Sequence, residues 1–229
     1  MVSQTIECIV PIAFKEAIEV LGPQFEAESG HRLEITHMLN PEVPGFIANG
    51  AQWDIAMTNP WHIDEIIAAG HTQASSHQPL GRSPLAFAIQ GSKTVTLLKT
   101  AQEIAKMLRD VESIAITGVG TSGGMFRNLA KKLGVLADIE SAIKPMAGGE
   151  PIKALVAGEV EMATVPLTNI VTIEGIIPVA TCPEDLGVHI DLAFCLNPVA
   201  AKPAQALADW LASPERDAGL AALGAPRFN

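Results

Sequence analysis

A strand, a glycine-rich turn and a helix follow one another without interruption between Ser113 and Leu133. The apolar run over 114–116 is typical of a buried parallel strand. An apolar stripe that begins at Phe126 predicts a helix. The turn between them contains Gly118, Gly120, Gly123 and Gly124. A helix that starts after such a turn presents backbone N–H groups at its positive N-terminus, where a phosphate or carboxylate can bind.

The glycine spacing also matches the dinucleotide fingerprint G-x-G-x-x-G. That fingerprint normally lies in the first βα unit and is followed, about 20 residues on, by an acidic residue at a strand end. Here the turn lies in the middle of the chain, and no clear strand leads into Asp138 or Glu140. A tight turn that binds nothing is the other alternative. With both alternatives open, we expect an anion or a polar ligand at Thr121, Ser122 and Gly123.

Composition limits the classes of partner. The chain has 229 residues, of which 48% are hydrophobic, so it can bury a large core as one domain or as two modest lobes. A net charge of −10 argues against nucleic acid and against anionic membrane surfaces. A small anion remains possible, because a helix terminus acts at short range. No stretch approaches the roughly 18 uninterrupted apolar residues of a membrane span, so we expect no membrane insertion.

Neither the cysteines nor the histidines are spaced as metal ligands. Cys8, Cys182 and Cys195 lie in or beside apolar stretches without C-x-x-C spacing, so we expect buried free thiols. We therefore expect no metal and no cofactor. The N-terminus has no basic segment followed by an apolar one, as a signal peptide would. As it stands, the sequence predicts a cytoplasmic protein, or a periplasmic one if Met1 replaces a removed signal sequence.

Strand and helix patterns alternate along the chain, which predicts an α/β fold with a mostly parallel sheet. The expected strands are 5–10, 32–38, 53–57, 85–89, 114–116, 162–165 and 192–196. The expected helices are 14–21, which should end at Gly22-Pro23, then 41–49, 61–69, 101–108, the helix after the glycine turn, 152–156 and 204–211.

Two turn-rich segments suggest boundaries between lobes. They lie at 71–84 and between Thr181 and Asn197. Two crossings mean that one lobe is inserted in the other. We expect lobe 1 to comprise 1–82 and 196–229, and lobe 2 to comprise 83–195.

Several segments together resemble a known family over almost the whole chain. They are Ala27–Ile35, Trp53–Ala56, Gly120–Gly124, Ala157–Ala163, and Asn197-Pro198 followed by Ala208–Glu215. The chain resembles the type II solute-binding proteins of ABC importers, nearest the molybdate-binding branch. The resemblance implies two α/β lobes that close by a hinge over a ligand cleft, and an ABC permease as partner if the protein is exported.

The sequence departs from that family where molybdate binders donate to their oxyanion. In those proteins one serine follows the first strand and another follows the second. Here these places read Pro11-Ile12-Ala13 and Asn40-Pro41, so we expect that molybdate is not the ligand. The same fold appears in aconitate isomerase, an enzyme that resembles the molybdate-binding proteins. That resemblance implies an alternative function, a cofactor-free isomerase that shifts an allylic proton and double bond on a carboxylate.

Ligands of open α/β sheets bind beyond the carboxyl ends of the strands. This rule selects as ligand-binding residues Ala13, Asn40, Thr58, Asn59, Arg82, Ser83, Thr121, Ser122, Gly123, Gly148, Gly149, Thr168 and Asn169. Asn59 is either a contact or a helix N-cap. Arg82 is either a bidentate carboxylate ligand or a solvated hinge charge. His62 is either a surface residue or the catalytic proton shuttle of an isomerase. The most favoured function is binding of a small organic anion of the di- or tricarboxylate class.

Overall fold

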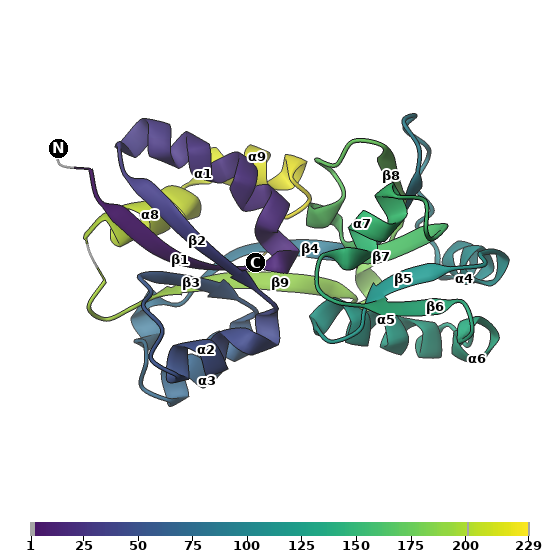
Figure 1. The fold of residues 1–229 in the computed structure, drawn as a ribbon, viewed down its shortest axis with the longest axis horizontal. Coiled ribbons are helices and arrows are strands. Elements are labelled where there is room, and N and C mark those ends of the chain that lie inside the picture. The colour runs from purple at the N-terminus through teal and green to yellow at the C-terminus, as the bar shows by residue number, and fades with distance from the viewer. Residues whose placement is uncertain (1–2, 201, 229) are drawn as a thin grey trace. The chain divides into compact units, whose positions relative to one another are not determined.

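The chain divides into two compact α/β units in the computed structural model, which describes residues 3–200 and 202–228 (Figure 1). Unit 1 contains the residues up to Arg82 and those from Asp191 onward, and unit 2 contains Ser83–Ile190. Unit 2 is therefore an insertion in the chain of unit 1. None of the helices in the described part of the chain combines the length and the apolar character that crossing a membrane requires.

Unit 1 is a sheet with helices on both faces. Its strands are β1 (Thr5–Pro11), β2 (Arg32–Met38), β3 (Ile55–Thr58) and most of β9 (His189–Leu196), in the order β2-β1-β3-β9. Its helices are α1 (Lys15–Ser29), α2 (Val43–Ala48), α3 (Pro60–Ala68), α8 (Lys202–Ala212) and α9 (Asp217–Ala222). Alternate residues of the strands, such as Ile9 and Ala56, pack with α2 and α3 in one apolar cluster. Figure 1 shows α1 and α8 on the opposite face.

Unit 2 repeats this layering. Its strands are β4 (Gln78–Gln90, which begins in unit 1), β5 (Ile114–Thr117), β6 (Ile143–Met146), β7 (Met162–Pro166) and β8 (Ile176–Thr181). Its helices are α4 (Ala101–Asp110), α5 (Thr121–Lys132), α6 (Leu136–Ile139) and α7 (Glu150–Val156). The strand order is β4-β7-β5-β6, and β8 pairs with β4. One face of the sheet packs on α4, α5 and α6, and the other packs on α7.

The structure adds detail to two sequence predictions: parallel pairs join β1 to β2 and β3, and β5 to β6 and β7, but other pairs are antiparallel. The sheet is mixed, because β9 runs antiparallel to β3, and β4 runs antiparallel to β7 and β8. The segment 71–84 is not a loop throughout, because β4 begins at Gln78. Leu80 and Ser83 are buried, and the Arg82 N–H donates to the carbonyl of Pro226 at 2.8 Å. The residue types of 78–84 favour turns, but burial and backbone hydrogen bonds hold this segment in an extended conformation.

Helix α1 does not end at Gly22-Pro23 as predicted but continues to Ser29. The buried side chains Ile18, Leu21 and Phe25 continue one apolar stripe past the proline. Packing of this stripe outweighs the cost of a proline inside a helix. The helix ends at Gly30, whose φ of +76° is the left-handed conformation typical of a glycine C-cap.

Candidate functional site

In unit 1, the predicted ligand residues lie at the carboxyl ends of three neighbouring parallel strands. Pro11 of β1 pairs with Met38 of β2, and Ile9 of β1 pairs with Ala56 of β3. Because the strands are in this register, the residues that follow them meet at one edge of the sheet. We call this set the unit 1 edge; it consists of Ala13, Asn40, Thr58 and Asn59.

The polar side chains of the unit 1 edge are buried and bonded within the protein. The Thr58 hydroxyl oxygen lies 3.1 Å from both the carbonyl oxygen and Oδ1 of Asn40. Nδ2 of Asn59 donates to the carbonyl of Asp191 at 2.8 Å. Asn59 does occupy the N-cap position of α3, but its side chain makes no capping hydrogen bond there. It joins the start of α3 to β9 instead.

His62 lies in the first turn of α3, beside this edge. Its side chain is 13% exposed, and its Nδ1 lies 3.3 Å from Oε2 of Glu65. The neighbouring Trp61 ring lies 5.8 Å away between centroids and remains 42% exposed. His62 is therefore a largely buried imidazole with a carboxylate partner, which is an arrangement that proton transfer can use.

Arg82 forms a bidentate ion pair at the point where the chain leaves and re-enters unit 1. Its Nε lies 2.6 Å from Oδ1 of Asp191, and its Nη2 lies 2.9 Å from Oδ2. Arg82 is the last residue of unit 1 before the insertion, and Asp191 is the first residue after it. The guanidinium also lies 4.6 Å from the ring centroid of Phe228. Because Arg82 binds a carboxylate of its own chain, the pair as a whole has little net charge.

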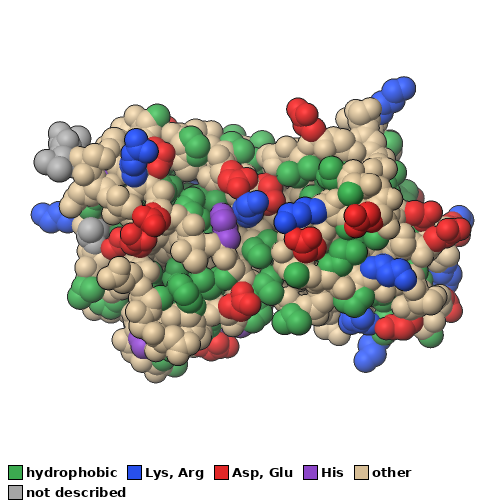
Figure 2. All heavy atoms as spheres, viewed as in Figure 1, with side chains coloured by type: hydrophobic (Ala, Val, Ile, Leu, Met, Phe, Trp, Pro, Cys, Tyr) green, Lys and Arg blue, Asp and Glu red, His purple; other side chains and the backbone are tan. Residues whose placement is uncertain are grey.

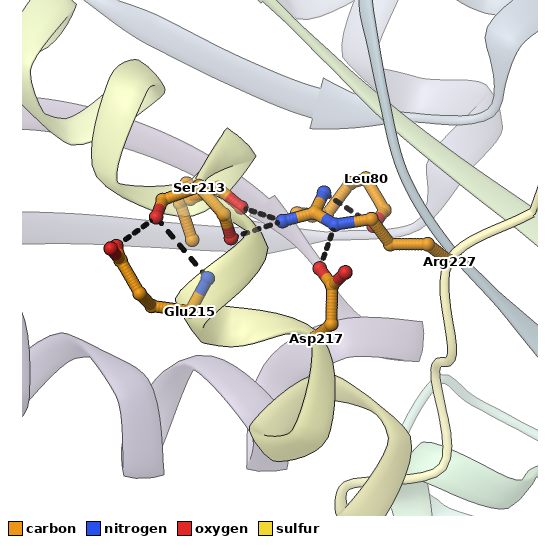
Figure 3. Close-up of polar contacts among 6 residues, drawn as sticks. Leu80, Ser213, Glu215, Asp217 and Arg227 are labelled. Carbon is orange, nitrogen blue, oxygen red and sulfur yellow. Dashed lines mark hydrogen bonds and ion pairs between the residues drawn. The ribbon is translucent and has the colours of Figure 1, made fainter.

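The last residues of the chain secure the start of β4. We call Ala225–Phe228 the C-terminal strap. Arg227 donates to the carbonyls of Leu80 (3.4 Å), Leu211 (2.5 Å) and Ser213 (3.0 Å), and it pairs with Asp217 (Figure 3). A Cβ on Gly81 would lie 2.5 Å from the carbonyl oxygen of Ala225, so only glycine permits this close approach.

In unit 2, predicted ligand residues again meet at one edge of the sheet. Thr117 of β5 pairs with Met146 of β6, and Ile116 pairs with Thr164 of β7. The antiparallel β4 places Leu85 opposite Pro166, which brings Ser83 to the same edge. We call this set the unit 2 edge; it consists of Ser83, Thr121, Ser122, Gly123, Gly148, Gly149, Thr168 and Asn169.

Hydroxyl groups and helix amides are the donors of the unit 2 edge. The Thr168 N–H donates to Oγ of Ser83 at 3.2 Å, and the two hydroxyl oxygens lie 3.4 Å apart. In α5 the Gly124 N–H donates to the Gly120 carbonyl at 3.3 Å. The amides just before Gly124 belong to the first turn, where a helix supplies no acceptor of its own. A Cβ on Gly123 would lie 1.8 Å from the Thr117 carbonyl oxygen, so packing alone requires this glycine.

Buried polar groups are concentrated at these two edges. Among the residues that the structure describes, nine polar or charged residues are buried, and six of them are predicted ligand residues. The six are Asn40, Thr58, Asn59, Ser83, Thr168 and Asn169. Burial of polar groups lowers stability unless they are bonded, so this concentration marks the edges as candidates for a functional role.

The structure gives less support to dinucleotide binding or to metal binding. Asp138 lies on α6 and pairs with Arg109 at 2.8 Å, and Glu140 pairs with Arg127 at 3.0 Å. Both acids are exposed, and neither follows a strand, unlike the ribose-binding acid of a dinucleotide site. Within 3–200 and 202–228, no three His, Cys, Asp or Glu residues are grouped so that they could hold a metal ion.

The three cysteines are free and buried. Burial raises the pKa of the Cys182 thiol and of the Cys195 thiol to about 12. These thiols are therefore protonated at neutral pH and are poor nucleophiles.

A groove of about 530 Å³ lies elsewhere on unit 2. Its lining includes Ile89, Met107 and Met162, and Met162 begins β7. The groove is therefore near the amino end of that strand and contains no predicted ligand residue.

Comparison with known proteins identifies the family. Residues 6–224 match the model of the bacterial extracellular solute-binding proteins. The chain belongs to this family. The resemblance found in the sequence is thereby confirmed, whereas no curated protein matches the sequence.

Solved structures confirm the α/β solute-binding fold. The periplasmic molybdate-binding protein of Azotobacter vinelandii superposes with a TM-score of 0.83 and 18% identity, over 98% of this chain and 100% of that chain. The sulfate-binding protein SubI of Mycobacterium tuberculosis superposes with a TM-score of 0.72 and 14% identity, over 99% of this chain and 88% of that chain. The L-phospholactate-bound PEB3, a protein of Campylobacter jejuni, superposes with a TM-score of 0.71 and 13% identity, over 97% of this chain and 100% of that chain. At such low identities the likeness concerns the fold alone.

Proposed function

We propose that this protein binds a small organic anion of the di- or tricarboxylate class and delivers it to an ABC permease outside the cytoplasm. In this proposal the unit 1 edge and the unit 2 edge are each a candidate ligand contact of their own unit. Membership of an extracellular solute-binding family supports the receptor role. Proteins of the same fold are described as binding molybdate, sulfate and L-phospholactate, which supports a small anion.

The observation that carries the proposal is the composition of the unit 2 edge. Ser122 and Gly123 lie in the first turn of the twelve-residue α5, beside the carboxyl end of β5. The buried hydroxyls of Ser83 and Thr168 lie at the same edge of the sheet. Backbone amides, hydroxyls and a helix N-terminus stabilise an anion without a positively charged side chain.

A carboxylate rather than molybdate is proposed because the unit 1 edge has lost hydroxyl donors. Ala13 follows β1, and Asn40 follows β2, at the places where molybdate binders carry serine. A buried oxyanion that lacks donors retains an uncompensated desolvation cost. An organic acid needs hydrogen-bond donors only around its carboxylate groups, because its carbon skeleton is uncharged.

Calorimetric titration and thermal unfolding of the purified chain test this proposal. The panel is citrate, cis-aconitate, malate, succinate, L-phospholactate, sulfate and molybdate. We expect a carboxylate to bind most tightly and to stabilise the fold by about 2.7 kcal/mol at 100 times its Kd. Failure of every anion in the panel to bind would contradict the proposal.

Two variants test whether the bound anion contacts the unit 2 edge. Ser122→Ala should weaken binding by about 1 kcal/mol, the net contribution of one hydrogen bond. Ser141→Ala is the matched control, because Ser141 is exposed just before β6, at the amino end of that strand. Equal affinities of the two variants would remove Ser122 from the site.

The environment of His62 supports a second candidate function, that of an isomerase. Its largely buried imidazole and its Glu65 partner lie beside the unit 1 edge. If the protein is an isomerase, cis-aconitate in deuterated water should exchange its allylic protons, as followed by NMR. His62→Ala should then slow exchange by about two to four orders of magnitude. Binding of cis-aconitate without any exchange would leave the receptor function alone.

A further inference from the structure

The amino ends of the unit 2 strands carry a depression that the proposed anion site does not use. The groove of about 530 Å³ adjoins a second groove of about 390 Å³, because Ile89 and Glu161 line both. Ser113 and Glu161, which line the second groove, immediately precede β5 and β7. We call the two grooves together the amino-end groove. All its lining residues belong to unit 2, so its geometry is that of one compact unit.

The floor of the amino-end groove is apolar. Ile89, Leu98, Met107 and Val111 line it, are half-buried, and pack on the apolar core of unit 2. Met162 lies at 3% exposure among them. Transfer of the remaining apolar surface out of water is favourable, and methionine side chains adapt to irregular partners. The floor therefore suits apolar side chains of a partner.

The rim of the amino-end groove is acidic. Glu103, Asp110, Glu159 and Glu161 line it, whereas Lys106 is the one basic residue among its described lining residues. Lys106 pairs with Asp110 at 2.5 Å. Four carboxylates and one ammonium group give the groove a net charge of −3 at neutral pH. This local field repels anions and attracts cations.

Glu161 lies where the acidic rim meets the apolar floor. Its Oε2 accepts a hydrogen bond from the Glu112 N–H at 2.7 Å, and its own N–H donates to Oγ of Ser113 at 2.9 Å. The next residue in the chain is Met162. The Glu161 carboxylate is therefore positioned beside the floor by a neutral amide, which leaves its negative charge uncompensated.

We propose that the amino-end groove binds a cationic amphipathic peptide segment of a partner protein. Apolar side chains of the segment pack on Ile89 and Met107, and its lysines or arginines lie against Glu159 and Glu161. A groove in two adjoining parts fits a length of chain better than a compact small molecule. This site contains none of the residues proposed to bind the anion, so the interaction goes beyond the proposed function.

Fluorescence anisotropy with a labelled peptide of leucine and lysine tests this proposal. The peptide is about 14 residues long, with leucine on one face of a helix and lysine on the other. We expect saturable binding to the wild-type chain that weakens as salt is added. Two matched peptides, one with glutamate in place of lysine and one with serine in place of leucine, should bind at least about tenfold more weakly.

One variant tests the apolar floor. Met107→Gln should weaken binding of the leucine-lysine peptide about tenfold, because it replaces apolar contact surface with an amide. Met125→Gln is the matched control, since Met125 is also half-buried against the core of unit 2 but lies on α5, outside the groove. Circular dichroism and thermal unfolding establish that both variants are folded.

A double variant tests the acidic rim. Glu161→Gln with Asp110→Asn should weaken binding of the leucine-lysine peptide about fivefold at low salt. Glu174→Gln with Asp185→Asn is the control, because it removes the same charge at exposed positions outside the groove. A control that weakens binding equally would show attraction by the whole chain and would overturn the assignment to the groove.

Four further outcomes would overturn the proposal. They are no saturable binding of the leucine-lysine peptide up to about 1 mM, affinity unchanged by Met107→Gln, equal binding of the glutamate peptide, and equally tight binding of n-hexylamine, which would identify a small-cation site instead. Calorimetry of the same variants with the anion panel should give wild-type affinities. Failure of the peptide proposal therefore leaves the proposed function standing, and failure of every anion leaves the peptide proposal standing.

Discussion

At the scale of single residues, close packing explains the glycine turn more firmly than ligand binding does. A Cβ on Gly123 would lie 1.8 Å from the Thr117 carbonyl oxygen, whereas a Cβ on the adjacent Gly124 would meet nothing within 4 Å. Gly123→Ala must therefore push the start of α5 away from β5. We expect a loss of about 3 kcal/mol in the free energy of unfolding, at the upper end for overpacked sites.

Gly124→Ala provides the internal comparison. It should leave stability unchanged or raise it by up to about 1 kcal/mol, because alanine favours a helix over glycine. Urea unfolding of both variants measures the difference. Equal midpoints for the two variants would show that α5 does not pack on Thr117 as described.

The polar residues at the strand ends could be predicted from the sequence, but their hydrogen-bond and ion-pair partners could not. Asn40, Thr58 and Asn59 follow predicted strands, so they could be selected from the sequence. Asp191, which binds both Arg82 and Asn59, was missed. It lies 109 residues from Arg82, and no local pattern reports a contact over such a separation.

At the scale of elements, a capping box begins α4 and makes its stability depend on pH. Oε2 of Glu103 accepts hydrogen bonds from the Thr100 hydroxyl at 2.7 Å and from the Thr100 N–H at 3.1 Å. These bonds, with one from the Lys99 N–H, lower the pKa of the Glu103 carboxyl. Its contribution to stability is present above the unfolded-state pKa and is lost as the pH falls through the lower folded-state value.

We therefore expect Glu103→Gln to destabilise the chain at pH 7 and to have a smaller effect at pH 3. Unfolding by urea at the two pH values measures this change. Glu174→Gln, at an exposed position before β8, is the control. A Glu103→Gln effect that is the same at both pH values would contradict the assigned role.

We expect the C-terminal strap to contribute more to the free energy of unfolding than a surface ion pair does. Arg227 is bound by Asp217 and by three backbone carbonyls, so its removal leaves several acceptors without a partner. We expect Arg227→Ala to cost about 2 kcal/mol or more. Arg109→Ala, which removes the exposed pair with Asp138, should cost less than about 1 kcal/mol. Similar losses in both variants would contradict this role of the strap.

Element prediction from the sequence succeeded where the pattern is local. The apolar alternation of β2 gave its observed bounds, Arg32–Met38. It failed where distant packing decides, as at Pro23 within α1 and at Gln78–Pro84 within β4. Short elements such as α6 and β6 were missed because four residues carry too little periodicity.

At the scale of the whole molecule, the two units share one plan, a layered sheet whose strand ends carry buried polar residues. Figure 2 shows acidic and basic side chains interspersed on the face in view, although the net charge is −10. Attraction of an anion therefore depends on local donors rather than on the charge of the whole chain. The sequence predicted the family and the fold class, whereas the partners of the strand-end side chains are set by contacts between residues far apart in the chain, such as Arg82 and Asp191.

The central claim is that a small anion binds the unit 2 edge. Hydrogen exchange measured by mass spectrometry, with and without the tightest-binding acid of the panel above, tests it most directly. The account predicts slower exchange at 118–124 and 166–169, the segments that carry the unit 2 edge. Slower exchange confined to other segments, such as those around Met107 and Met162 in the groove, would contradict the account.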